Sequence, residues 1–125
     1  MNATLLDSKI LGIIDLDKRN RVSFPPKLFE FLGDTNQIKL VEFGSSISEK
    51  TRLIIVDFNE EVEGKMVATL NVNKNERRTV LPKRIRKFLG VDNVNHKYLI
   101  IHTEKFGDKE YAILKRLDIN KILGD

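Results

Sequence analysis

The chain has 125 residues, 41% of them apolar and 32% charged, which suffices for one compact domain or two very small ones. Lys and Arg (22) outnumber Asp and Glu (18), no run approaches the roughly 18 apolar residues that span a membrane, and no secretory signal pattern opens the chain, so we expect a cytoplasmic protein. The absence of cysteine excludes disulfides, cysteine-based zinc sites and thiol catalysis.

An internal repeat organises the chain. Residues 22–33 (VSFPPKLFEFLG) and 79–90 (TVLPKRIRKFLG) match at an offset of 57 residues, with Pro, Phe, Leu and Gly at the same places in both. Upstream, residues 14–21 resemble residues 70–78 if the second copy carries one extra loop residue. An ordered set of matches at one offset indicates a duplicated unit.

In the first unit, residues 1–62, the β-rich segment 10–16 leads through a polar turn at 17–20 into a short second strand that ends at Pro25. Asn20 suits a turn position with positive φ. A two-turn helix follows, with Pro26 at its first position and Gly33 as a left-handed residue after its end. Strands 37–43 and 51–58, joined by the turn 44–50, complete the unit.

The second unit, residues 63–125, repeats this order. Residues 66–72 alternate in polarity as a half-buried strand does, and a turn at 73–77 precedes Pro82. Further predicted elements are a helix ending at Gly90, strands 97–103 and 110–117 joined by the turn 104–109, and one helical turn within 118–125. The fold class is therefore mainly β (α+β), ββαββ twice, with both halves sharing one core as a pseudo-dimer because either alone is too small.

Charge is divided unequally between the halves. Residues 1–62 hold 8 basic and 10 acidic side chains, whereas residues 63–125 hold 14 basic and 8 acidic ones. Seven cations fall within residues 74–87, and no acid occurs between residues 77 and 91. A helix kept soluble by Lys and Arg normally also carries Glu, so this composition favours contact with a polyanion over a merely solvated face.

Catalytic and metal-binding patterns are missing from the sequence. It has no HExxH, GxSxG, Walker or GxGxxG motif. His96 and His102 would lie about 20 Å apart on one strand, too far for a shared metal, and Asp15 and Asp17 are explained by a strand end and a turn. We therefore expect no enzyme activity, no metal and no cofactor.

The order strand, Asp-x-x-x-Arg turn, strand, Pro, short helix, Leu-Gly and two strands resembles the AbrB/SpoVT swapped-hairpin DNA-binding domain, and two such units are similar to the MraZ arrangement. The resemblance covers residues 9–117, with residues 17–21 (DKRNR) at the Asp-x-x-x-Arg turn. It implies a swapped-hairpin β-barrel whose turn arginines and helix cations face DNA, in a transcription regulator. This chain departs from the pattern with Phe29 and Glu30, which we expect on the outer side of the first helix, and with Asn73 in place of the second turn's Asp.

We therefore expect a protein that binds double-stranded DNA without entering a membrane, mostly through phosphate contacts and a few arginine contacts to bases. The resemblance gives the turn role to Arg21 and Arg78 and the helix role to Arg86 and Lys87. The candidate DNA-binding residues are Lys18, Arg19, Arg21, Lys74, Arg77, Arg78, Lys83, Arg84, Arg86 and Lys87. The alternative is a protein-interaction module, such as a double-psi-like barrel or a toxin-binding antitoxin, in which the acidic first half binds a protein partner. The protein partner would be toxin-like or a second copy of the chain.

Overall fold

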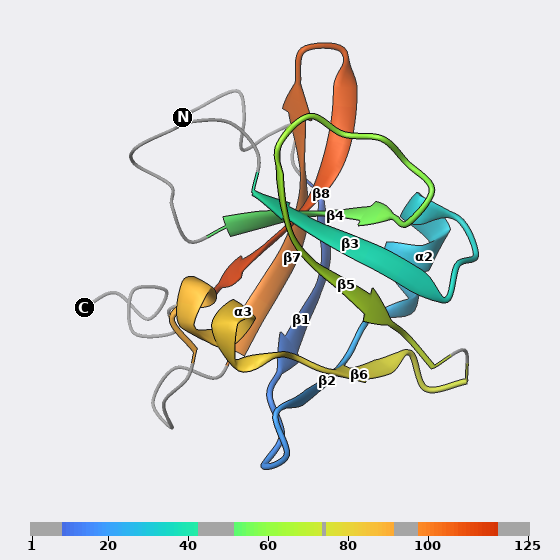
Figure 1. Ribbon diagram of the computed structural model, residues 1–125. Coiled ribbons are helices and arrows are strands. Elements are labelled where there is room, and N and C mark those ends of the chain that lie inside the picture. The colour runs from blue at the N-terminus through green and yellow to red at the C-terminus, as the bar shows by residue number, and fades with distance from the viewer. Residues whose placement is uncertain (1–8, 43–51, 74, 92–97, 118–125) are drawn as a thin grey trace, which may run out of the picture.

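The computed structural model describes residues 9–42, 52–73, 75–91 and 98–117, which form a mainly β, α+β structure (Figure 1). The predicted turn 44–50, His96 and the tail 118–125 lie outside the described residues. The first half contains β1 (Ile10–Asp15), β2 (Arg21–Ser23), α2 (Pro26–Leu32), β3 (Gln37–Glu42) and β4 (Arg52–Asp57). The second contains β5 (Lys65–Asn71), β6 (Arg78–Val80), α3 (Lys83–Leu89), β7 (Tyr98–Phe106) and β8 (Lys109–Arg116).

Two sheets interleave the halves. Six antiparallel strands follow the order β1-β7-β8-β4-β3-β5, and β2 pairs with β6 in a separate two-stranded ribbon. In the sheet, β1 from the first half pairs with β7 from the second, and β5 from the second half pairs with β3 from the first. If each strand is replaced by its equivalent in the other half, the strand order read from one edge of the sheet equals the order read from the other edge. The predicted ββαββ order is confirmed, whereas the division of the chain at residue 62 stays a prediction.

The sheet is open in the described part of the chain. Its edge strands β1 and β5 pair only on their inner sides, so the predicted closure into a barrel is not seen there. Each edge strand carries a bulge, where the register shifts between Ile10 and Gly12 and where Met66 and Ala68 oppose consecutive residues of β3. The bulges occupy equivalent places in the two halves. Bulges at sheet edges bend the strand and hinder further pairing.

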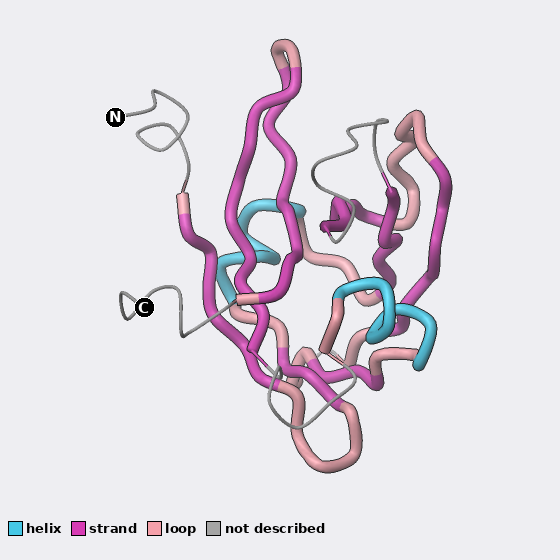
Figure 2. Tube along the Cα trace, turned by 90° about the vertical axis from the view of Figure 1, so that its left-hand side faces the viewer, coloured by secondary structure: helices cyan, strands magenta, loops and turns pink. Residues whose placement is uncertain are grey.

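One hydrophobic core holds both halves together. It contains equal numbers of buried residues from each, among them Leu40 and Leu53 from the first half and Leu99 and Leu114 from the second. A smaller cluster around Ile54 covers the opposite face of the central strands. Because strands of the two halves are interleaved in the sheet, neither half buries its apolar residues without the other. The two helices lie apart from each other against this core (Figure 2).

Both helices begin directly after proline and end before glycine. Pro26 is the first residue of α2 as predicted, and Gly90 after α3 has the predicted left-handed conformation (φ 75°, ψ 31°). Gly33 does not, because its φ of 96° combines with an extended ψ of 162° that sends the chain straight toward β3. Phe29, expected on the outer side of α2, is buried in the core. The predicted turn 104–109 is shorter, since β7 continues to Phe106.

Within the described ranges no helix has the length and apolar content needed to cross a membrane.

Gly12 marks a close approach between β1 and the start of α2. A Cβ atom at this position would lie 2.7 Å from Cγ of Pro25. We expect Gly12→Ala to destabilise the protein by about 1–3 kcal/mol, because either the strand or the Pro25 ring must move. Urea unfolding of the variant measures this change. The equivalent residue Ala68 is a buried alanine, so Ala68→Gly, which creates no such contact, should cost only about 0.5–1 kcal/mol. A Gly12→Ala protein as stable as the wild type would contradict the close contact.

Candidate nucleic-acid interface

The first turn, residues 17–20, is organised by the Asp17 carboxylate. Its Oδ1 accepts hydrogen bonds from the backbone N–H groups of Arg19 (2.8 Å) and Arg21 (2.9 Å), and its Oδ2 forms an ion pair with Arg21 Nε at 2.8 Å. Asn20 has the positive φ (62°) expected of it. Asp17 therefore shapes the turn and holds the Arg21 guanidinium beside it, while Lys18 and Arg19 are exposed.

The second turn, residues 73–77, uses a neutral residue for the same purpose. Asn73 Oδ1 accepts the backbone N–H groups of Asn75 (2.8 Å) and Glu76 (3.1 Å). Arg77 has a positive φ of 53°, which a non-glycine residue adopts at a cost, and its guanidinium lies 5.5 Å from the centre of the Phe29 ring. Without a carboxylate at position 73, Arg78 instead contacts Glu76 at 3.5 Å and Ser23 Oγ at 3.4 Å.

Strands β2 and β6 bring the two turn arginines onto one surface. Their register pairs Arg21 with Val80 and Ser23 with Arg78, whereas the intervening Val22 points into the core. Alternation along a strand therefore puts these four paired side chains on the outer face of the ribbon. Arg21 and Arg78 are diagonal neighbours on this face, with Cα atoms about 7–8 Å apart.

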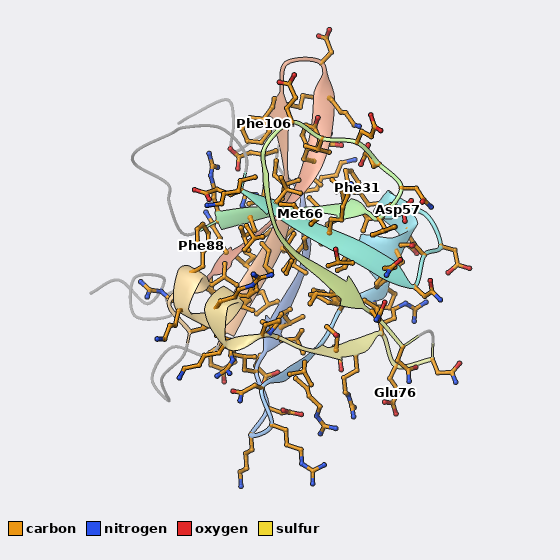
Figure 3. All side chains as sticks on the ribbon, in the orientation of Figure 1. Phe31, Asp57, Met66, Glu76, Phe88 and Phe106 are labelled. Atoms are coloured by element: carbon orange, nitrogen blue, oxygen red, sulfur yellow. The ribbon has the colours of Figure 1, made fainter. Side chains whose placement is uncertain are left out.

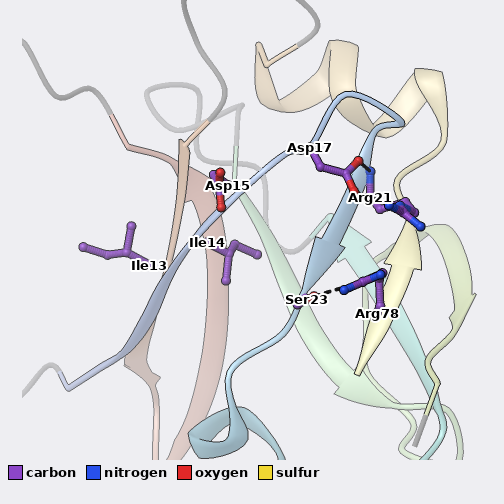
Figure 4. A pocket seen from close by; sticks show the side chains of 7 residues that line it. All are labelled: Ile13, Ile14, Asp15, Asp17, Arg21, Ser23 and Arg78. Carbon is purple, nitrogen blue, oxygen red and sulfur yellow. Dashed lines mark hydrogen bonds and ion pairs between the residues drawn. The ribbon is translucent and has the colours of Figure 1, made fainter. Parts of the chain in front are cut away.

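A cleft of about 250 Å³ lies between the ribbon and the end of β1 (Figure 4). Arg21, Ser23 and Arg78 line it from the ribbon, and Asp15 and Asp17 line it from β1 and the first turn. The cleft thus has two guanidinium groups and two carboxylates. Ile13 and Ile14 of β1 complete its lining, so the cleft is partly apolar.

Backbone hydrogen bonds between the halves determine which turn lies beside which helix. Leu81 N–H, just before α3, donates to Asn20 O in the first turn at 2.9 Å, and Phe24 N–H, just before α2, donates to Arg77 O in the second turn at 2.9 Å. The first turn, with Arg21 directly after it, and α3 therefore form one end of the ribbon, called here the α3 end. The second turn, with Arg78 directly after it, and α2 form the other, called the α2 end (Figure 1).

The two ends differ strongly in charge. The α3 end has a single acid, Asp17, and seven cations: Lys18, Arg19, Arg21, Lys83, Arg84, Arg86 and Lys87. Among the described residues, the α2 end has three cations (Lys27, Arg77 and Arg78) and two acids (Glu30 and Glu76). Glu76, one of the two acids of the α2 end, lies in the second turn (Figure 3). Positive charge is thus concentrated at the α3 end.

Nine of the ten candidate residues lie in the described part of the chain, and the tenth, Lys74, lies outside it. The structure divides the basic segment 74–87 between the two ends of the ribbon, so it is not one continuous patch. Arg86 is half-buried and donates from Nε to Leu81 O at 3.1 Å, which links it to the start of its own helix. Phe31 and Phe88 are partly buried and packed against the core.

Sequence reasoning missed Ser23 and Val80. They occupy equivalent positions at the offset of 57 residues and lie between the arginines on the outer face, where Val80 is 54% exposed. The repeat itself contained the signal, because pairing its two short strands in antiparallel register places these residues beside Arg78 and Arg21.

The pKa of the Asp17 carboxyl lies below its ordinary value of 3.8, mainly because the Arg21 backbone N–H donates to it, with the Arg21 side chain and the Arg19 N–H adding to the effect. A lowered pKa means that the charged form stabilises the turn above pH 3.8 and that this contribution is lost as the pH falls through the folded-state value. NMR titration of Asp17 should give a midpoint below 3.8. Arg21→Ala keeps the backbone N–H and removes the guanidinium, so the midpoint should rise part of the way toward 3.8, and an unchanged midpoint would contradict the ion pair.

Comparison with protein-family models, curated proteins and solved structures finds no match to this chain. In the described ranges, no group of three or more His, Asp or Glu side chains is arranged to hold a metal ion.

Proposed function

We propose that the protein binds double-stranded DNA through the outer face of the β2–β6 ribbon, its two turns and α3, and that it acts in the cytoplasm as a transcription regulator of the AbrB/MraZ type. In this proposal the interleaved halves form a swapped-hairpin pseudo-dimer. Support comes from the pairings of β1 with β7, β5 with β3 and β2 with β6, each of which joins one half to the other.

The observation that carries the proposal is the meeting of the two turn arginines, from separate segments, on the outer face of the β2–β6 ribbon. Arg21 and Arg78 are 57 residues apart in the chain, yet they are diagonal neighbours on the ribbon. The ribbon has two strands, the size of β element that the major groove of DNA, about 12 Å wide, accommodates. The exposed cations Lys83, Arg84 and Lys87 on α3 flank one end of it.

These groups have different chemical roles. Lys and Arg side chains at the turns and on α3 neutralise phosphates and release counterions, so affinity falls as salt rises. Within the described residues, Arg78 makes long contacts of 3.4 and 3.5 Å, so its guanidinium can be turned toward a guanine edge with little loss. Arg21 must first exchange its short ion pair with Asp17.

The experiment that tests the proposal is fluorescence anisotropy with labelled random-sequence duplex DNA of about 20 base pairs, a length that covers two half-sites. The wild type should bind at low salt, and Arg21→Ala combined with Arg78→Ala should weaken binding about 10-fold or more. Lys9→Ala combined with Lys105→Ala removes the same charge from exposed positions outside both turns and α3, and should bind nearly as the wild type does. Equal affinity of the two double variants would refute the assignment of the site.

The alternative, a protein-interaction module, predicts a different result in this assay. Ile10 and Ile13 are about 60% exposed on the edge strand β1, which suits contact with another protein. A module of this kind would bind duplex DNA no better than an unrelated protein of equal net charge.

A further inference from the structure

The outer face of the ribbon is an approximate two-fold arrangement whose halves are chemically different. Three equivalent pairs of positions carry the difference: Asp17 and Asn73 in the turns, Ser23 and Val80 on the strands, and Glu30 and Lys87 on the helices. Resting on the proposed function, we infer that the protein reads a non-palindromic DNA site and binds it in one orientation, with the α3 end on a fixed half-site.

The Ser23 and Val80 pair determines which base edges each half of the ribbon recognises. Val80 is exposed opposite Arg21, whereas Ser23 is exposed opposite Arg78 and accepts a hydrogen bond from it. An apolar side chain in the major groove favours contact with the thymine methyl group, and a hydroxyl group accepts or donates hydrogen bonds to several bases. The two halves of the ribbon therefore recognise different base edges, although both contain an arginine.

The turns add a second difference. Asp17 holds Arg21 through a 2.8 Å ion pair, and this carboxylate also repels nearby phosphates and guanine acceptors. Asn73 shapes the second turn without a charge and leaves Arg78 with two longer contacts. Base contact by an arginine is thus easier at Arg78, whereas the phosphate contacts gather at the α3 end.

The helices add a third difference, which fixes the orientation by charge. At the positions equivalent to Arg86 and Lys87 on α3, helix α2 has the buried Phe29 and the exposed Glu30. Turning the protein around on its site would place Glu30 against the phosphates that Lys87 contacts. A reversed complex therefore loses phosphate contacts as well as base contacts.

The test uses a single attachment point for a DNA-cleaving iron chelate. The chain has no cysteine, so Asn75→Cys at an exposed position of the second turn gives one defined attachment site. Binding sites are first selected by the wild type from a random duplex pool. We expect a non-palindromic consensus and cleavage by the labelled variant on one side of it, at least about tenfold over the other side, since one mismatched base pair costs about that much affinity.

The matched variant makes the halves alike. Asp17→Asn, Ser23→Val and Glu30→Lys, introduced together into the labelled protein, copy onto the first half the residues of the second. On a palindrome built from the half-site read beside Val80, cleavage should then be equal on both sides. The variant should also bind this palindrome more tightly than the parent does, and circular dichroism confirms that it is folded.

The outcomes separate the inference from the proposed function. Wild-type binding with a palindromic consensus, with no consensus, or with equal cleavage on both sides overturns the single orientation and leaves DNA binding intact. A symmetrised variant that is folded and still cleaves one side overturns the assignment to these three pairs. A wild type that binds no duplex DNA overturns the proposed function and this inference together.

Discussion

Replacing Lys83, Arg84 and Lys87 by glutamine is expected to weaken duplex DNA binding about 100-fold at about 100 mM salt. These three cations are exposed on α3, and their helix contains no acid that could neutralise them. They lie at the end of the ribbon where the first turn adds Lys18 and Arg19. The loss should therefore be the largest that any three surface substitutions produce.

The control variant removes equal charge elsewhere. Lys9, Lys65 and Lys105 are exposed and belong to neither turn nor α3. Their replacement by glutamine should change the affinity less than about threefold, an effect of net charge alone. Anisotropy titrations of both variants, with thermal melting to show that each is folded, measure the difference. Equal losses in the two variants would mean that charge acts without a defined site.

Leu114→Ala is expected to lower the free energy of unfolding by about 2–5 kcal/mol. Leu114 is fully buried on β8 and pairs in register with the buried Leu53 on β4, at the centre of the six-stranded sheet where the halves meet. Removing its side chain leaves a cavity bordered by residues of both units. Because a domain of this size usually unfolds in one step, the whole chain should lose stability together.

Urea denaturation followed by circular dichroism measures this loss. Met66→Ala is the matched control, since Met66 is 58% exposed on an edge strand and its truncation should cost less than about 0.5 kcal/mol. The Leu114→Ala transition should remain single and shift to lower urea. Two separate transitions, with only one of them shifted, would show that the halves fold as independent units and would contradict the shared core.

Local features were predictable because each depends on a few adjacent residues. The repeat at an offset of 57 residues predicted the ββαββ order, and Pro26, Gly90 and Asn20 determine a helix start, a helix end and a turn through their own backbone preferences. Gly33 shows the limit of such reasoning. Its positive φ follows from the residue type, but its ψ follows from the direction in which β3 must leave.

Features that depend on pairing between the halves could not be read in this way. Arg78 and Lys83 are close in the sequence and were predicted to belong to one basic segment. The pairing of β2 with β6 instead puts the second turn beside α2 and the first turn beside α3, so the two residues lie at opposite ends of the ribbon. The prediction that Phe29 lies on the outer side of α2 was wrong for the same reason. Its burial depends on the core and on Arg77, which packs over its ring from the other half.

The salt dependence of wild-type binding to random-sequence duplex DNA tests the central claim most directly. If the cations of the turns and α3 neutralise phosphates, the logarithm of the association constant falls linearly with the logarithm of salt concentration, with a slope near −0.9 for each phosphate contacted. The seven cations of the α3 end, with Arg78, predict a slope between about −4 and −7 from about 50 to 200 mM salt. Binding that is absent at the lowest salt, or a slope near zero, would contradict a phosphate-binding surface.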